Sequence, residues 1–270
     1  MSQQSKSHGR KSISANSQPR ALITQSPQLA GVWTAQILTL FPEAFPGVLG
    51  ESLTGRALKD GKWALDTIDL RLFGEGKHRN VDDTPAGGGA GMVLKPNVAG
   101  AALDRALAQQ KTPLPMVCLS PRGTPFTQAK ARAWANAGGV TMLCGRFEGI
   151  DQRVIDHYQL EEVSLGDFVL TGGEIAAQAM IDATVRLLPD ILGNEASIAE
   201  ESHMAGLLEH PHYTRPALWN GRPIPDVLQS GHHINIAKWR QEMSQQVTKE
   251  KRPDLWAAFQ NALGKPDPKD

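Results

Sequence analysis

The chain has 270 residues, 40% of them hydrophobic, and its 28 basic residues balance its 28 acidic ones. No stretch approaches the ~20 uninterrupted apolar residues of a membrane helix, so we expect a soluble, cytoplasmic protein without a membrane partner. The two cysteines, Cys118 and Cys144, stand inside apolar runs. This setting favours buried thiols and gives a disulfide or a metal site almost no support.

The zero net charge hides a segregation along the chain. From Leu160 to Glu201 there are nine acidic residues and one base, Arg186. From His203 to Arg252 there are seven Lys and Arg against four acidic residues, together with five histidines. An acidic stretch followed by a basic one can bind a cation in its middle and a phosphate backbone at its edge, although solvated surface charge gives the same pattern.

Residues 1–30 are rich in Ser and Gln and lack hydrophobic periodicity, so we predict a disordered N-terminal tail. Their acid-free, Arg- and Ser-containing composition also resembles an organellar transit peptide, without an amphipathic face. A misassigned start codon is a further explanation.

Order is predicted to begin with a buried strand from Trp33 to Leu40. A helical pattern follows to about Lys59, and Trp63 to Leu70 alternates like a second strand. The stretch from Arg71 to Gly91 has no periodicity and ends in the run Gly87 to Gly91. A loop of about twenty residues is usually functional or disordered, and this run does not match a phosphate-binding motif.

Strands and helices then alternate as far as about Leu188. We predict helices at 98–109, 127–136, 150–157 and 173–188, strands at 114–119, 140–144 and 162–165, and a short apolar segment at 168–170. This alternation predicts an α/β domain over 31–192 with a mostly parallel sheet. Because ligands of such sheets bind beyond the carboxyl ends of the strands, the turns at 120–123, 145–149 and 166–173 are the candidate site.

Beyond Pro189 the pattern changes. Residues 193–206 are small and acidic and predict an interdomain linker. Residues 207–270 lack strand alternation and contain helical stretches at 234–246 and 254–263. We predict a small, basic, mostly helical C-terminal domain.

Several long motifs share an order with one known family. They are Leu119-Ser-Pro, Leu143-Cys-Gly-Arg-Phe-Glu-Gly-Ile-Asp151, Gly166-Asp-Phe-Val-Leu-Thr-Gly-Gly-Glu174 and Pro211-His-Tyr-Thr-Arg-Pro216. Together with Gly87 to Met92 and Ser230 to Arg240, they closely resemble bacterial tRNA (guanine-N1)-methyltransferases of the knotted SPOUT class. The resemblance covers roughly Trp33 to Leu255.

The resemblance implies a deep trefoil knot whose loops bind S-adenosylmethionine in a bent conformation. It also implies a homodimer in which each active site takes residues from both subunits. The substrate it implies is the guanosine immediately 3′ of the anticodon, position 37, in a subset of tRNAs.

The family's cofactor-lining loops correspond to three segments of this chain. By position they are Leu119 and Ser120, then Gly145 and Glu148, then Leu165, Gly166, Asp167, Phe168, Val169, Leu170 and Gly172. For Leu165, Val169 and Leu170, plain core packing is an alternative that is compatible with backbone binding. A sulfonium methyl donor is cationic, so the net acidity between 160 and 201 would stabilise it.

Methylation of guanine N1 requires that N1 lose its proton. A positioned carboxylate can take that proton, and a cation near O6 can stabilise the charge that develops. Arg186 matches the family's catalytic arginine, with a structural role beside neighbouring acids as the alternative. The family's aspartate is replaced by glutamate in Ala199-Glu-Glu-Ser-His203, so we predict Glu201 as the base, with Glu200 and His203 as alternatives.

The basic C-terminal segment fits an RNA-docking surface. His212, Arg215, Lys238 and Arg240 are predicted to contact phosphates while the catalytic loops read a flipped base. Arg215 lies in a family motif, whereas Lys238 and Arg240 are equally well explained as solvated charges. Two other readings remain: another SPOUT enzyme acting on ribosomal RNA or a ribose 2′-hydroxyl, and an RNA-binding homologue that has lost catalysis.

Overall fold

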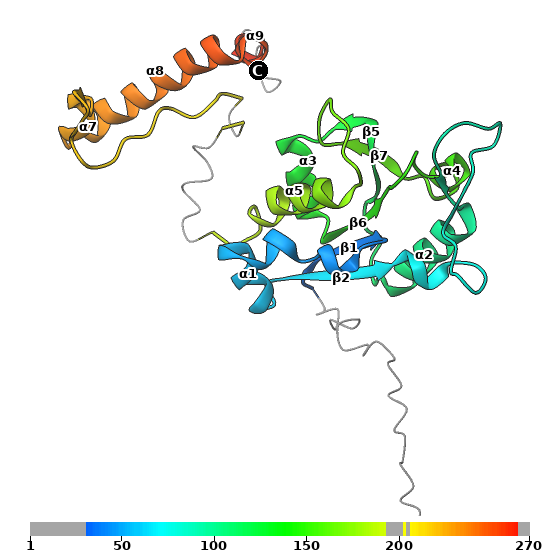
Figure 1. Ribbon diagram of the computed structural model, residues 1–270. Helices are drawn as coiled ribbons and strands as arrows, with labels where there is room; N and C mark the ends of the chain where they lie inside the picture. The colour runs from blue at the N-terminus through cyan, green and yellow to red at the C-terminus, as the bar shows by residue number, and fades with distance from the viewer. Residues whose placement is uncertain (1–30, 193–201, 204–205, 264–270) are drawn as a thin grey trace, which may run out of the picture.

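A computed structural model describes residues 31–192, 202–203 and 206–263. A five-stranded sheet with the order β2-β1-β6-β5-β7 forms the centre of the first part, and every pairing in it is parallel (Figure 1). The strands are β1 (Trp33–Thr39), β2 (Trp63–Asp69), β5 (Met116–Pro125), β6 (Gly139–Cys144) and β7 (Glu161–Ser164). The prediction of a mostly parallel α/β sheet is confirmed.

Helices cover both faces of this sheet. They are α1 (Ser52–Lys59), α2 (Pro96–Gln109), α3 (Gln128–Asn136), α4 (Gln152–Tyr158) and α5 (Glu174–Val185). Alternate residues of β1 and β6 enter opposite cores, as strand geometry requires. Ile37 and Met142 pack with α1, α3 and α5, whereas Leu38 and Leu143 pack with α2 and α4.

The predicted strands and helices of this part are found close to their expected bounds, except before α1 and at the end of β5. The helical pattern after Phe41 is broken into 3-10 turns at Pro42–Ala44 and Gly47–Gly50 before α1 begins. Gly47 has a φ of 54°, which interrupts a right-handed helix. The apolar segment 168–170 lies in the loop between β7 and α5 and is neither strand nor helix.

The long loop before α2 contains little regular structure. A 3-10 turn at Leu70–Phe73 follows β2, and the two-residue strands β3 (Asp82–Asp83) and β4 (Val93–Leu94) pair antiparallel. The glycine run between these strands has positive φ at Gly87, Gly88, Gly89 and Gly91. Its backbone therefore takes conformations that other residues rarely adopt.

Strand β5 continues past its predicted end with a break in register. Leu119 pairs with Val163, and Thr124 pairs with the same residue, so residues 120–123 bulge out of the ladder. A Cβ on Gly123 would lie 2.4 Å from the Val163 nitrogen, so the bulge needs glycine there. The bulge places Ser120 to Arg122 at the carboxyl end of the sheet.

The part after residue 206 has helices α7 (Asp226–Gln229), α8 (His233–Lys251) and α9 (Pro253–Leu263), and α8 contacts α9. A short hairpin joins β8 (Leu218–Trp219) to β9 (Arg222–Pro223). Both long predicted helices are present, and α8 extends five residues beyond its predicted end. No helix in the described parts of the chain is long and apolar enough to cross a membrane.

Candidate active site

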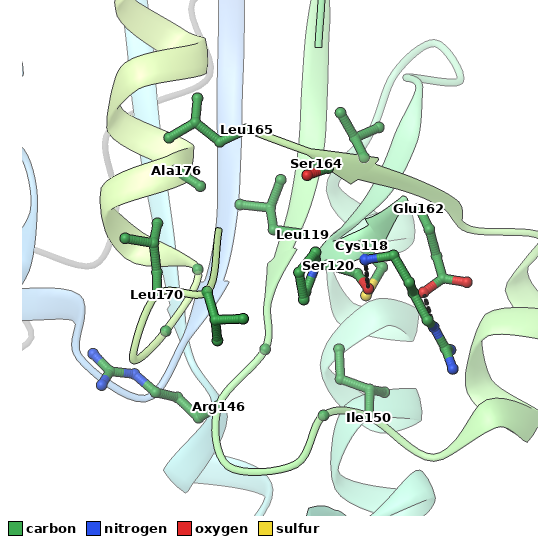
Figure 2. A pocket seen from close by; sticks show the side chains of 18 of the residues that line it. Cys118, Leu119, Ser120, Arg146, Ile150, Glu162, Ser164, Leu165, Leu170 and Ala176 are labelled. Carbon is green, nitrogen blue, oxygen red and sulfur yellow. Dashed lines mark hydrogen bonds and ion pairs between the residues drawn. The ribbon is translucent and has the colours of Figure 1, made fainter. Parts of the chain in front are cut away.

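A cavity of about 330 Å³ opens at the carboxyl ends of β5, β6 and β7. Its walls are the β5 bulge, the turn after β6 and the loop from β7 to α5, together with the first turn of α5 (Figure 2). These are the three turns that the sequence placed at this edge. The parallel sheet gathers them because all of its strands end on the same side.

Most of the predicted cofactor-binding residues line this cavity. They are Leu119, Ser120, Gly145, Glu148, Leu165, Phe168, Val169, Leu170 and Gly172. Gly166 and Asp167 belong to the same loop but do not line the cavity. Leu165 and Leu170 also pack against the core, whereas Phe168 and Val169 are 54% and 81% exposed, so core packing does not explain the last two.

A polar network that the sequence did not indicate forms one rim of the cavity. Arg122 Nε donates to Glu162 at 2.7 Å, and its Nη2 donates to Gln152 at 2.7 Å. The bond to Glu162 raises the pKa of Arg122. The network joins the β5 bulge to β7 and α4, and it places a carboxylate beside apolar walls. Nothing in the spacing of these residues indicated that they meet.

The glycine-run loop reaches the same turn. Glu148 N donates to Met92 O at 2.9 Å, and Leu94 N donates to Gly149 O at 3.0 Å. A Cβ on Gly91 would lie 2.3 Å from Glu148 Oε1. The glycine run, which does not match a phosphate-binding motif, therefore packs directly against a wall of the cavity.

Both cysteines are buried and free, as predicted. Burial raises the pKa of the Cys118 thiol to about 12, and burial also raises the pKa of Cys144 well above its usual value. Cys118 lines the cavity. Neither thiol is suited to act as a nucleophile near neutral pH.

Of the two predicted catalytic residues, Arg186 lies away from this cavity, and Glu201 is not among the residues that the structure describes. Arg186 is half-buried at the carboxyl end of α5, whereas Ala176, near the start of this helix, lines the cavity. At 1.5 Å per residue the two positions are about 15 Å apart along the axis. Glu201 and the alternative Glu200 lie outside the described residues. His203, the other alternative, is exposed, and its backbone nitrogen donates to Leu207 O at 2.9 Å.

The predicted RNA-binding residues are all exposed. His212 Nε2 lies 2.9 Å from Glu209, and Lys238 lies 3.8 Å from Glu242 on α8. Arg215 stands between the 210–213 segment and the hairpin. Lys238 and Arg240 are two positions apart on one helix, so their side chains diverge by about 200° and do not form a single patch.

Aromatic side chains join the segment that carries His212 to α8, the helix that carries Lys238 and Arg240. Trp239 contacts the rings of His210 and Tyr213, with centroids 6.2 and 6.1 Å away, and so anchors this segment on α8. Trp219 and Leu218 of the hairpin are 63% and 62% exposed. From His210 to Pro225 the sequence has no Asp or Glu. Among the residues that the structure describes, no three His, Cys, Asp or Glu side chains are placed to hold a metal ion.

Comparison with known proteins identifies the family of this chain. The family model for tRNA (Guanine-1)-methyltransferase TrmD matches residues 34–258. A tRNA (guanine-N(1)-)-methyltransferase of Ruegeria pomeroyi is 64% identical over 238 residues, which cover 88% of this chain and 98% of the relative. Proteins with the same name from Cereibacter sphaeroides and Brucella ovis are 65% and 56% identical, covering 88% and 85% of this chain and 96% and 93% of theirs. The chain belongs to the TrmD family of tRNA (guanine-N1)-methyltransferases.

Proposed function

We propose that this chain transfers the methyl group of S-adenosylmethionine to N1 of the guanosine immediately 3′ of the anticodon in tRNA. Family membership supplies the reaction, and the cavity at the carboxyl edge of the sheet is the observation that supports the cofactor. Its volume of about 330 Å³ is in the range of small-molecule sites. Because the substrate is tRNA, we place the activity in the cytoplasm.

The lining of the cavity fits this cofactor. Apolar side chains of Leu119, Ile150 and Leu170 offer faces for an adenine ring, and bare backbone at Gly145 and Gly172 offers hydrogen-bonding groups (Figure 2). Glu148 adds negative charge for a cationic sulfonium or an amino group, whereas the charge of Glu162 is matched by its ion pair with Arg122. When bound, S-adenosylmethionine supplies an electrophilic methyl group. The chain's own contribution is to bind and orient it and to exclude water.

The position of Arg186 argues for catalysis between two subunits. Arg186 lies about 15 Å along α5 from the cavity of its own chain, too far for a guanidinium to reach a base held there. We propose that Arg186 and Glu201 act on a guanine held at the cavity of a second copy. Glu201 would remove the N1 proton, and Arg186 would stabilise charge on O6.

An exposed apolar surface supports this dimer. Val48 and Ile175 are 68% and 62% exposed. They lie on neighbouring elements, because Gln178 on α5 donates to Ala44 O at 3.0 Å. Val169, in the cavity loop, is 81% exposed. Exposed apolar residues are typical of a protein interface, and we place that interface beside the cavity because Val169 lines it and Ile175 adjoins Ala176, which also lines it.

The trefoil knot is part of the same proposal. After β7, at the edge of the sheet, the chain returns past β5 to the end of β6, where Arg146 bridges Gly172 and Gly173 N donates to Gly145 O at 3.0 Å. We propose that the chain threads through the preceding loops at this return, which would form the knot. Within this proposal, residues 207–270 form the tRNA-docking domain, joined by the 193–206 linker.

A methyl-transfer assay tests the proposal. Two tRNA transcripts carry guanosine or adenosine beside the anticodon, and labelled S-adenosylmethionine is the donor. We expect label on the guanosine transcript alone, at N1 by nucleoside analysis. Equal labelling of both transcripts would defeat the guanine-N1 assignment. Cofactor binding without any transfer would identify a homologue that has lost catalysis.

A further inference from the structure

Arg146 and Glu174 form an ion pair where the two glycine-containing segments of the cavity meet. Arg146 follows β6 by two residues, and Glu174 is the first residue of α5. Arg146 Nη2 lies 2.9 Å from a Glu174 carboxylate oxygen, and the Glu174 side chain is only 5% exposed. Figure 2 shows the Arg146 side chain beside the loop that carries Leu170, directed away from Ser120 and Glu162. We call this pair and its contacts the Arg146–Glu174 clasp.

The clasp is anchored on β1, an interior strand of the sheet. Thr39, the last residue of β1, donates through Oγ1 to Glu174 Oε1 at 2.7 Å. The Arg146 guanidinium lies over the Phe41 ring, 4.3 Å from its centroid. Because β1 is buried along its whole length, the contacts at its end hold the Glu174 carboxylate and the Arg146 guanidinium from the core side of the cavity.

The Arg146 guanidinium also holds the cavity loop. Its Nη1 donates to Thr171 O at 3.2 Å, and its backbone bridges Gly172. A Cβ on Gly172 would lie 2.2 Å from Arg146 Nε, so glycine lets the loop backbone approach the side chain this closely. The guanidinium therefore connects β1, the β6 turn and the end of the loop at 165–172.

The loop needs such an anchor, because its middle does not pack. The start is held by Ser164 Oγ, which donates to Gly166 O at 2.9 Å and accepts from Gly166 N at 3.1 Å. Phe168 and Val169, between the two anchors, are both mostly exposed. The position of the loop backbone in the cavity is thus set at its two ends.

Stability alone does not account for an ion pair at this place. A buried pair loses hydration, and apolar side chains of similar volume often stabilise a protein equally well. Arg146 Nε is buried and has no hydrogen-bond partner among the described residues, and the contact with Glu174 Oε2 lacks hydrogen-bond alignment. What the arginine provides and an apolar side chain cannot is a directed bond to the Thr171 carbonyl.

We propose that Arg146 is a positioning residue for methyl transfer, and that the clasp presets the 165–172 backbone in the conformation that binds the cofactor. This inference rests on the proposed function, since it takes the cavity as the cofactor site. Without the clasp the loop would have to order on binding, so the cofactor would bind more weakly. A methyl donor that is not aligned with guanine N1 would also react more slowly.

Three variants of the full-length protein test the clasp: Arg146→Met, Glu174→Gln and Thr39→Val. The measurements are S-adenosylmethionine affinity by calorimetry, KM and kcat for methyl transfer, thermal midpoint, and hydrogen exchange of amides 165–172 without cofactor. We expect Arg146→Met to weaken cofactor affinity on the order of tenfold and to lower kcat, with faster exchange in the loop. Thr39→Val, which does not touch the cavity, should change the same quantities in the same direction by less.

Arg153→Met is the matched control. Arg153 pairs with Asp151 at 2.7 Å on the same turn, but its side chain is 77% exposed and does not line the cavity. It should leave affinity, KM and loop exchange unchanged. If Arg146→Met does not fold, Glu174→Gln and Thr39→Val carry the test.

Two outcomes distinguish a failure of the positioning role from a failure of the proposed function. A lower thermal midpoint with wild-type cofactor affinity, kcat and loop exchange in the clasp variants would overturn the positioning role and leave a structural one. A wild-type protein that neither binds the cofactor nor methylates tRNA would instead overturn the proposed function.

Discussion

The side-chain amide of Gln36 donates to the Asp66 carboxylate at 3.4 Å, between the neighbouring strands β1 and β2. Gln36 is fully buried, and its oxygen accepts hydrogen bonds from Thr141 and Gln110, both at 3.0 Å. Asp66 is a partly buried carboxylate at the edge of this hydrogen-bond network, where water reaches it only in part. Burial raises the pKa of Asp66, and the bond from Gln36 only partly offsets this.

The raised pKa of Asp66 predicts a pH-dependent gain for Asp66→Asn. The folded state binds the Asp66 proton more tightly than the unfolded state, so the carboxylate costs stability at any pH above the folded pKa. The cost disappears as pH falls through the folded pKa toward the ordinary value of 3.8. Asparagine keeps an acceptor for Gln36 without the charge, so the variant should melt at a higher temperature at pH 7.

Thermal unfolding between pH 4 and 8 measures this gain. The advantage of Asp66→Asn over the parent should be greatest at neutral pH and should shrink at the acidic end. Asp60→Asn, at the exposed end of α1, makes the same charge change without burial and should show no such trend. A variant that is less stable than the parent at pH 7 would show that the carboxylate is stabilising.

The two thiols are predicted to resist alkylation in the folded protein. The thiolate is the reactive form, and burial raises the pKa of Cys118 to about 12 and that of Cys144 well above the usual value. Iodoacetamide at pH 8 should leave both unmodified by mass spectrometry over a time in which the guanidinium-unfolded chain is labelled twice. Rapid labelling of the native protein at either cysteine would contradict this.

Patterns of apolar residues were enough to predict the sheet and most helices. β1 and β6 are mostly apolar and are buried along their whole length, and α8 and α9 lie where helical periodicity placed them. The β5 bulge was missed because a register shift depends on how Thr124 meets Val163, which is a property of two strands together. No periodicity of one segment contains it.

The candidate site was likewise predictable from the sequence only in part. Its glycine turns could be found because glycine signals unusual backbone and because the ends of parallel strands share an edge. The Arg122–Glu162 pair and the Arg146–Glu174 clasp could not, since each joins charges from segments far apart in the sequence. A motif identified Arg146 and Glu174 as neighbours of the site, but only the fold shows that they bind each other.

A mixing experiment tests whether Arg186 acts in a partner's site. In the proposed dimer, Arg186→Ala should remove the catalytic arginine and Ser120→Trp should fill the cavity, so each variant alone should be inactive. In a mixed dimer, the intact cavity of the Arg186→Ala subunit meets the intact Arg186 of the Ser120→Trp subunit. Random exchange of subunits should therefore restore about a quarter of wild-type activity from two inactive proteins.

Size-exclusion chromatography or sedimentation provides the control for this experiment, because both variants must remain dimers. Mixing with no recovery, while mixed dimers are demonstrably present, would show that Arg186 serves its own chain or has no catalytic role. Val48→Asp on the exposed apolar surface should reduce both dimer formation and activity.

Trp219 is predicted to stack on an unpaired base of the anticodon loop. It is 63% exposed on a short hairpin, within a segment that has Arg215 and Arg222 but no acidic residue from 210 to 225. Base–aromatic stacking contributes about 1–3 kcal/mol, so Trp219→Ala should weaken tRNA binding by roughly 5- to 150-fold. Trp219→Phe should retain most of the affinity.

Filter binding with tRNA and with the isolated anticodon stem-loop measures this effect. Ile234→Ala removes an apolar side chain that is 81% exposed on α8 and should change neither affinity. S-adenosylmethionine affinity should be unchanged in all three variants. If Trp219→Ala instead dissociates the dimer at unchanged tRNA affinity, Trp219 belongs to a protein interface.

Glu201 is predicted to remove the guanine N1 proton, and its substitutions test this directly. Glu201→Gln removes the base and should lower kcat by about 100-fold or more, with tRNA and cofactor affinity retained. Glu201→Asp restores a carboxylate and should keep measurable activity, because the linker backbone has to compensate for only one methylene. Full activity in Glu201→Gln would exclude Glu201, and the same substitution at Glu200, or His203→Ala, would then locate the base. A base that is a carboxylate should also make kcat fall at acidic pH with a midpoint near that of a carboxylic acid, whereas a histidine base would shift that midpoint toward about 6.5.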